Sequence, residues 1–160
     1  MVSQASGQPM RIGLLAALPD WALAELEPHL EVHACDTGEQ LLDQHGKATK
    51  VALLLDGHVD ALISFEDGAE FIVETISERG ALLGWSAFRP PFRYTASIRF
   101  TSPGHAISIP AAALYDVFAR STELEFQVLQ EAASELAVRL RNAQRQIQRA
   151  EATAPAEGTA

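Results

Sequence analysis

The sequence predicts an α+β fold that is mainly β, with a small antiparallel barrel or sandwich between helices. Three observations predict it. Apolar residues recur at helical spacing near the start, short apolar runs separated by turn residues fill the middle, and an uninterrupted helical pattern follows Pro110. A chain of 160 residues fits one such domain, and a hydrophobic fraction of 48% is enough to bury a core.

The first helical pattern lies between residues 11 and 30. Residues 18–21 read as a helix start, because Pro19 is tolerated in a first turn and Asp20 is favourable at the positive end of the helix dipole. Pro28 then ends the helix. Residues 1–10 are small and polar and lack the pattern of a signal peptide, so we expect a loose tail there.

Seven short apolar runs follow, each bounded by glycine, proline or aspartate. They are residues 31–34, 40–42, 51–55, 59–65, 71–76, 94–100 and 106–109. Asp67-Gly68, between two of these runs, is a strong hairpin signal. Many short strands at close spacing are typical of a small antiparallel barrel or sandwich.

Two helices are predicted after Pro110, a short one over residues 111–120 and a long one over residues 123–150. The long pattern contains no glycine or proline, and its apolar residues alternate between spacings of three and four. They are Phe126, Leu129, Ala133, Leu136, Leu140, Ala143 and Ile147. This heptad spacing is typical of a helix that pairs with another helix.

We therefore expect these seven residues to form a homodimer seam. The alternative is that the seam packs against its own barrel. A helix of this length should be roughly 42 Å long, which is more than a small barrel spans, and this favours the dimer. Residues 151–160 have the composition of a disordered tail.

Charge and composition exclude several classes of protein. A net charge of −9 disfavours binding to nucleic acid, because phosphate backbones repel an acidic protein. One basic row exists, formed by Arg139, Arg141, Arg145 and Arg149. It is either a solvated helix face or, as a weaker alternative, a DNA contact of a transcription regulator. No apolar run is long enough for a membrane span, and the single Cys35 excludes an internal disulfide, so we expect a cytoplasmic protein.

Four short motifs occur in a suggestive order. They are the segment 37–42 followed by Gly46, the apolar run 51–55 followed by Gly57-His58-Val59, the pair Gly80 and Gly84, and Thr95-Ala96. In this order they resemble the turns, strands and phosphate-binding cassette of the cyclic nucleotide-binding domain of catabolite-activator and Fnr-like regulators. The resemblance covers about residues 12–150.

The resemblance implies an eight-stranded antiparallel jelly-roll barrel with an N-terminal helix and a short plus a long C-terminal helix. It divides the chain into a barrel domain over residues 11–122 and a dimerisation helix over residues 123–150. It also implies a stand-alone form without a helix-turn-helix domain. The ligand would be a cyclic nucleotide or another small anionic molecule, and no further cofactor is required.

The cassette departs from the family pattern at its two polar anchors. Trp85 stands where the family has its ribose-binding glutamate, and Tyr94 stands where it has its phosphate-binding arginine. Arg93 is one residue earlier, and adjacent residues of a strand point to opposite faces. The residues that the resemblance places at the ligand are Gly84, Trp85, Ser86, Ala87, Arg93, Tyr94, Thr95 and Ala96.

The segment 84–94 also resembles a loop of small stand-alone proteins in this superfamily, some associated with redox or hydrogenase systems. Its aromatic residues either stack on a planar ligand or fill the pocket with hydrophobic surface. Arg89 and Arg93 either grip an anion or are surface charges beside a proline turn. Ser86 either donates to a ligand or caps a short helix.

Enzymatic interpretations have little support. The five histidines (His29, His33, His45, His58 and His105) are scattered and do not form a metal-binding motif. Cys35 has no neighbouring histidine, and Glu66-Asp67 falls on a turn. We expect a non-enzymatic, homodimeric regulatory domain that acts through an effector protein, with a redox enzyme system as one candidate. The alternative is a degenerate barrel that binds no small molecule and serves as a protein-interaction module.

Overall fold

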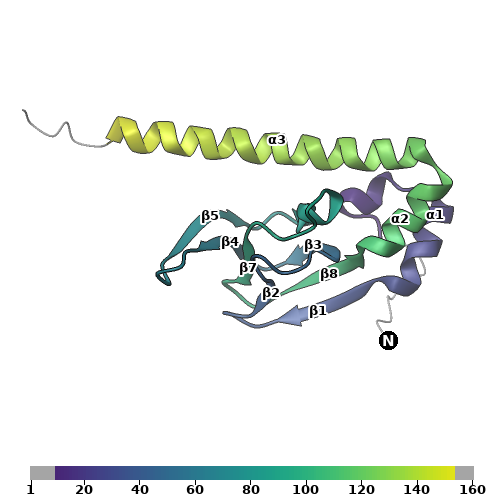
Figure 1. Cartoon of the computed structure of the whole chain (residues 1–160), viewed down its shortest axis with the longest axis horizontal. Helices are drawn as coiled ribbons and strands as arrows, with labels where there is room; N and C mark the ends of the chain where they lie inside the picture. Colours follow the sequence, from purple (N-terminus) through teal and green to yellow (C-terminus); the bar gives the residue numbers. More distant parts are fainter. Residues whose placement is uncertain (1–9, 154–160) are drawn as a thin grey trace, which may run out of the picture.

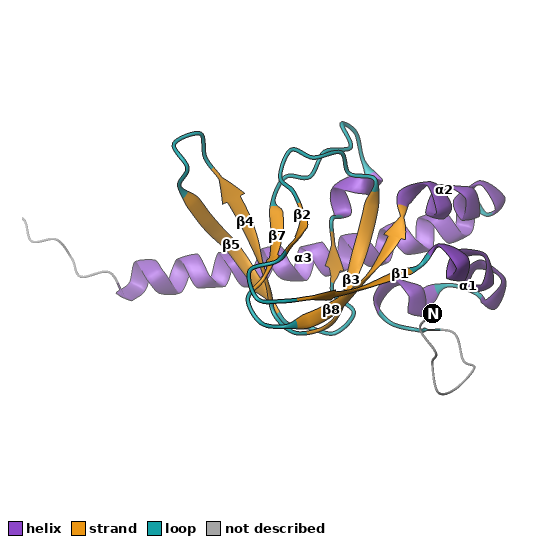
Figure 2. Ribbon diagram, turned by 90° about the horizontal axis from the view of Figure 1, so that it is seen from below, coloured by secondary structure: helices purple, strands orange, loops and turns teal. Residues whose placement is uncertain are grey.

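The computed structural model describes residues 10–153, in which eight strands form two four-stranded antiparallel sheets (Figure 2). The strands are β1 Glu31–Cys35, β2 Gln40–Leu42, β3 Lys50–Asp56, β4 Val59–Ser64, β5 Glu70–Ile76, β6 Leu82–Leu83, β7 Ser97–Phe100 and β8 Gly104–Pro110. Their order is β1-β8-β3-β6 in one sheet and β2-β7-β4-β5 in the other. The predicted α+β class is confirmed, but the closed jelly-roll barrel is not, because the described strands stay in two separate sheets.

Each of the seven predicted runs contains a strand, although residues 94–96 lie before β7 rather than in it. The eighth strand, β6, is missing from the sequence-based prediction because two residues are too few for an alternating pattern. It pairs with β3 through Leu82 opposite Leu53 and Leu83 opposite Ala52. The hairpin signal at Asp67-Gly68 is confirmed, since β4 and β5 pair on either side of it.

The N-terminal helical region is divided into three pieces instead of one helix. They are the 3-10 turn η1 Gly13–Ala17, the helix α1 Asp20–Leu26 and the 3-10 turn η2 Glu27–His29. Leu18 has an extended backbone, with ψ of 139°, as expected for a residue before proline. The apolar spacing therefore continues across a break that Pro19 imposes.

Two further helices complete the fold, α2 Ala111–Arg120 and α3 Thr122–Thr153 (Figure 1). Ser121 caps α3, since its hydroxyl accepts a hydrogen bond from the Leu124 N–H at 3.2 Å. α3 extends beyond the predicted range 123–150 at both ends, so residues 151–153, expected in a disordered tail, are helical. The remaining tail residues, 1–9 and 154–160, lie outside the described residues.

α3 runs along the body and its C-terminal part extends past the β4–β5 hairpin (Figure 1). Leu124, Val128 and Ala132 are buried on the side that faces the body. Of the predicted seam, Phe126, Leu140 and Ile147 are 66%, 61% and 60% exposed, whereas Leu129, Leu136 and Ala143 are half-buried. The seam therefore lies partly toward the body and partly toward solvent, and its role in a homodimer stays a prediction.

One apolar core joins both sheets with α1, α2 and the first turns of α3. Its largest fully buried side chains include Phe100, Leu53 and Ile107. Within residues 10–153 no helix combines the length and the apolar character that crossing a bilayer requires.

Substitution of Val128 by alanine tests the packing of α3. Val128 is fully buried, so V128A should lower the free energy of unfolding by about 1–2.5 kcal/mol. The matched control is V138A, in the same helix, because Val138 is 47% exposed. This control should change stability by less than about 0.5 kcal/mol. Equal losses in urea unfolding would contradict the observed orientation of the helix.

Candidate functional site

A cavity of about 50 Å³ lies where β6, the 3-10 turn η3 Trp85–Phe88 and the segment before β7 meet α3. Its lining consists of Ala61, Leu82, Leu83, Gly84, Trp85, Ser86, Tyr94, Thr95, Ala96, Ile98 and Arg139. Six of the eight predicted ligand residues are in this lining. Ala87 and Arg93 are not.

Gly84 has a conformation that the cavity wall requires. Its φ of +76° is in the left-handed region, and an added Cβ would lie 2.8 Å from Leu42 Cδ1 and 3.1 Å from Tyr94 Cε1. A larger residue would therefore be strained and would push against the cavity wall. The glycine predicted from the cassette resemblance has a steric reason here.

Tyr94 occupies the position where the family has arginine, and it is 6% exposed. Its hydroxyl donates a hydrogen bond of 2.7 Å to the Lys50 carbonyl, and burial raises the pKa of the phenol. The ring is therefore a fixed part of the wall. For Tyr94, the structure favours the interpretation that an aromatic side chain fills the pocket.

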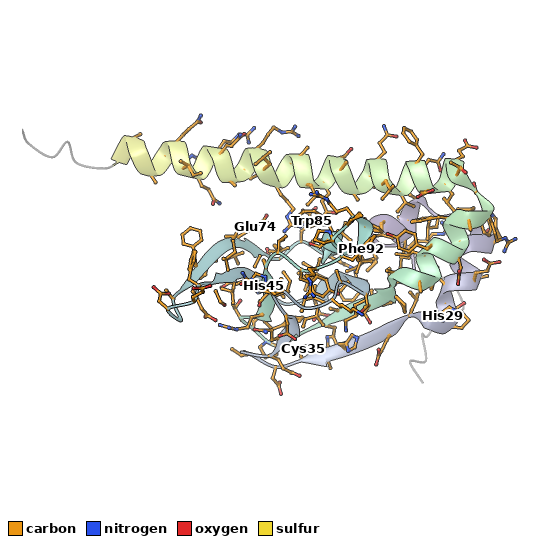
Figure 3. All side chains as sticks on the ribbon, viewed as in Figure 1. His29, Cys35, His45, Glu74, Trp85 and Phe92 are labelled. Carbon is orange, nitrogen blue, oxygen red and sulfur yellow. The ribbon has the colours of Figure 1, made fainter. Side chains whose placement is uncertain are left out.

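The other aromatic residues of this loop do not form a common stack. Trp85 and Phe88 are half-buried, and only Trp85 lines the cavity. Phe92 is 42% exposed and has a positive φ of 54°. Figure 3 places Trp85 and Glu74 on the side of the body that α3 covers.

Arg93 and Ala87, the other two predicted ligand residues, are not in the lining of this cavity. Arg93 is exposed, and its Nη1 donates to the His45 carbonyl at 2.7 Å. It follows Phe92 and precedes the buried Tyr94, so the alternation of an extended chain directs it outward. Ala87 is fully buried, and its carbonyl accepts a hydrogen bond of 3.0 Å from Tyr115. Arg89 is also exposed.

α3 contributes two residues to the site that sequence analysis did not assign to it. Glu135 Oε1 accepts the Leu82 N–H at 2.7 Å, and Arg139 Nη1 donates to the Leu82 carbonyl at 2.9 Å. Arg139 also holds Glu74 of β5, with Nε and Nη2 at 2.8 and 2.7 Å from Oε2. One turn of α3 thus satisfies both backbone groups of a residue in β6.

These contacts change the interpretation of the arginine row. Arg139 points to the body and lines the cavity, so the four arginines do not share one solvated face. The available sequence signal was the spacing of four residues between Glu135 and Arg139, which puts an acid and a base on the same side of a helix. Burial raises the pKa of the Glu135 carboxyl, with the Leu82 N–H and Arg139 acting in the opposite direction.

The histidines and Cys35 are distributed over other parts of the body. His33 Nε2 lies 2.8 Å from Ser108 Oγ, and His105 Nδ1 lies 2.9 Å from Asp56 Oδ1. Burial raises the pKa of the Cys35 thiol. Among residues 10–153, no three His, Cys, Asp or Glu side chains are grouped closely enough to bind a metal ion.

A larger, open hollow of about 550 Å³ lies between the start of α1 and the start of α3. It contains none of the predicted ligand residues. Two of its charged groups are paired with each other, since Arg11 bonds to Asp20 and also to the Leu18 carbonyl. Trp21 in its wall is covered by the Arg120 guanidinium, 4.7 Å from the ring centre.

Comparison with known proteins agrees with the fold. The cyclic nucleotide-binding domain family matches residues 32–121, which is more than half of the chain. The chain therefore belongs to the cyclic nucleotide-binding domain family. No match was found among curated proteins.

Solved structures are similar over most of the chain. One is described as a cyclic nucleotide-binding protein from Geobacter metallireducens GS-15, with 27% identity and a TM-score of 0.68 over 79% of this chain and 91% of that one. Another is the sensor domain of the transcriptional regulator DNR from Pseudomonas aeruginosa, with 22% identity and a TM-score of 0.67 over 80% and 85%. A cyclic nucleotide-binding domain from Methylobacillus flagellatus KT has 19% identity and a TM-score of 0.70 over 88% and 78%. The last two show likeness of fold alone.

The raised pKa of Glu135 predicts how the contact with Leu82 responds to pH. A raised pKa means that protonation of the Glu135 carboxyl stabilises the folded state. This stabilisation is fully present below the usual glutamate pKa, and it is lost as the pH rises through the raised pKa of the folded state. E135Q keeps an oxygen acceptor for the Leu82 N–H without a charge. It should be more stable than the wild type at neutral pH, and this advantage should shrink as the pH falls toward the usual glutamate pKa. Urea unfolding across this range measures the difference, and a constant difference would contradict the assignment.

Proposed function

We propose that this chain is a regulatory sensor domain that acts through a partner protein, with a pocket that differs from the standard cyclic nucleotide site. The observation that carries the proposal is the position of Arg139. This residue lines the cavity and belongs to α3, the helix whose other face is exposed and apolar. A ligand in the cavity would therefore touch the element that is best placed to bind another protein.

The pocket supports a non-standard ligand in two ways. Ligand sites for drug-sized molecules usually have volumes of roughly 300–1,000 Å³, whereas this cavity has about 50 Å³. The two polar anchors of a cyclic nucleotide are also replaced, by Trp85 and by the buried Tyr94. Losing two charge-assisted contacts costs roughly 1.5–3 kcal/mol each.

The exposed seam supports a homodimer through α3. Phe126, Leu140 and Ile147 are large apolar side chains exposed to solvent, and the heptad spacing aligns them along one stripe of the helix. An isolated helix face of this kind is unfavourable in water, and burial of each such side chain would contribute about 1.5–3 kcal/mol. The dimer would give the partner protein two copies of the sensor domain.

The signal would pass from the cavity to α3 through Arg139 and Leu82, and then to an effector protein bound near the helix pair. The resemblance of the segment 84–94 to loops of accessory regulators makes a cytoplasmic redox enzyme system a candidate for that effector. DNA is a weaker candidate partner, because Arg139 is engaged with Glu74 and the chain carries a net charge of −9.

A second candidate function is a protein-interaction module without any small ligand. The burial of Tyr94 and the small cavity favour it. Under this alternative, Arg139 and Glu135 hold α3 permanently in place of a ligand. Titration of the cavity with small ligands separates the two functions, since only the sensor responds.

Sedimentation equilibrium of the full chain tests the seam. The wild type should be dimeric at micromolar concentration. L140E and I147E place charges in the seam and should raise the dimer dissociation constant by about tenfold or more. N142E introduces the same charge change at an exposed polar position between them and should leave the dissociation constant unchanged.

If the wild type is monomeric at that concentration, the proposed homodimer is wrong. Equal weakening by N142E and L140E would show that net charge, rather than the seam, controls association.

A further inference from the structure

We propose that the cavity binds a small planar oxyanion such as a carboxylate, with Arg139 of α3 as its cationic anchor and Glu74 as an internal competitor. This inference rests on the proposed sensor function and specifies its ligand. It assigns the role of the missing cassette arginine to a residue on another element, more than forty positions later in the chain than Tyr94.

The Arg139 guanidinium has donors left for a ligand. A guanidinium carries five N–H groups in a planar fork. Nε and Nη2 face Glu74, and Nη1 donates to the Leu82 carbonyl, so these contacts use three of the five. The remaining two N–H groups are on the side chain that lines the cavity. A planar fork matches the geometry of a planar oxyanion.

Ser86 supplies an independent indication of a ligand. It lines the cavity and is 5% exposed, and its hydroxyl has no hydrogen-bond partner among the described residues. Every fully enclosed side-chain nitrogen or oxygen in residues 10–153 does have a partner. The Ser86 hydroxyl therefore keeps some accessible surface, and the residue that carries it lines the cavity.

Thr95 places a second hydroxyl in the lining, on the exposed side of the site. It too has no hydrogen bond within the described part of the chain. The rest of the lining is mainly apolar, including Ala61, Leu83 and Ile98. Two hydroxyl donors and one guanidinium in apolar surroundings form a small site for a group that accepts hydrogen bonds and carries negative charge.

The size of the cavity limits the ligand. A cavity needs roughly 10–15 Å³ to hold one water molecule, so about 50 Å³ has room for roughly three to five groups of that size. Formate or acetate fits this limit, whereas a nucleotide does not.

The acidic groups around Arg139 determine what binding does to the fold. Glu74 contacts the guanidinium directly, Glu135 lies one helical turn away, and Glu78 is close enough to raise the pKa of Glu135. An anion bound to Arg139 would be repelled by Glu74 at short range. An anion on the two remaining N–H groups therefore competes with Glu74 for the guanidinium and weakens the contact between β5 and α3, while Arg139 keeps its bond to Leu82.

Fluorescence titration of the full chain reports on the site, because only two tryptophans are present and Trp85 lines the cavity. W21F leaves Trp85 as the sole tryptophan and keeps an aromatic ring against Arg120. In this background, sodium formate and sodium acetate should give a saturable change that sodium chloride at equal ionic strength does not give. Calorimetry with the same two salts should report the same affinity.

Variants identify the anchor and the competitor. R139Q should weaken binding of formate at least tenfold, and R139K should weaken it less, because lysine keeps the charge without the fork. E74Q should strengthen binding by several fold, because the competing carboxylate is gone. R141Q, two residues along the same helix and exposed, should bind formate as the wild type does.

The proposal is overturned if neither anion gives a saturable signal in the wild type or in E74Q, or if R139Q with an unchanged circular dichroism spectrum binds like the wild type. Binding of cyclic AMP with equal or higher affinity would overturn the ligand class. Sedimentation of the same samples keeps this test separate from the proposed function. If the protein is a dimer that binds neither anion, the oxyanion proposal is wrong and the protein-interaction module remains. If the protein is a monomer, the proposed dimer seam is wrong.

Discussion

The arrangement of the site depends on the way α3 holds a single residue of β6. Leu82 pairs with β3 on one side, and Glu135 and Arg139 satisfy its N–H and carbonyl on the other. A two-residue strand at a sheet edge would otherwise expose these polar groups. Together with the buried Leu124, Val128 and Ala132, this contact holds α3 over the body, and it brings a guanidinium into the cavity wall.

The same contact explains how a family cassette without its two polar anchors can retain a defined site. Tyr94 occupies the position of the usual arginine, and its hydroxyl donates a hydrogen bond to the Lys50 carbonyl. The ring is thereby held in the wall of a small cavity. The positive charge then comes from α3, so charge and helix position are linked. Under the proposed sensor function, a ligand at this site would contact the helix that carries the charge.

The fold was largely predictable because turn residues and apolar runs alternate along the chain. The long helix was predictable from its uninterrupted apolar spacing, and the cassette order indicated most of the residues in the cavity wall. The contact of Arg139 with the body was not predictable from the sequence. A row of arginines at helical spacing occurs both on solvated helix faces and on helices whose arginines make buried contacts. Only the packed helix shows that Leu124, Val128 and Ala132 turn Arg139 toward β6. β6 was missed because two residues carry no periodicity.

Amide hydrogen exchange, measured by mass spectrometry on peptides spanning 78–84 and 132–143, tests most directly whether α3 and β6 behave as one unit. R139Q should speed exchange in both peptides together, while R141Q should leave both unchanged, because Arg139 donates to the Leu82 carbonyl and Arg141 is exposed. Faster exchange in the helix alone, or unchanged exchange in R139Q, would mean that the contact with Leu82 does not couple the cavity to α3.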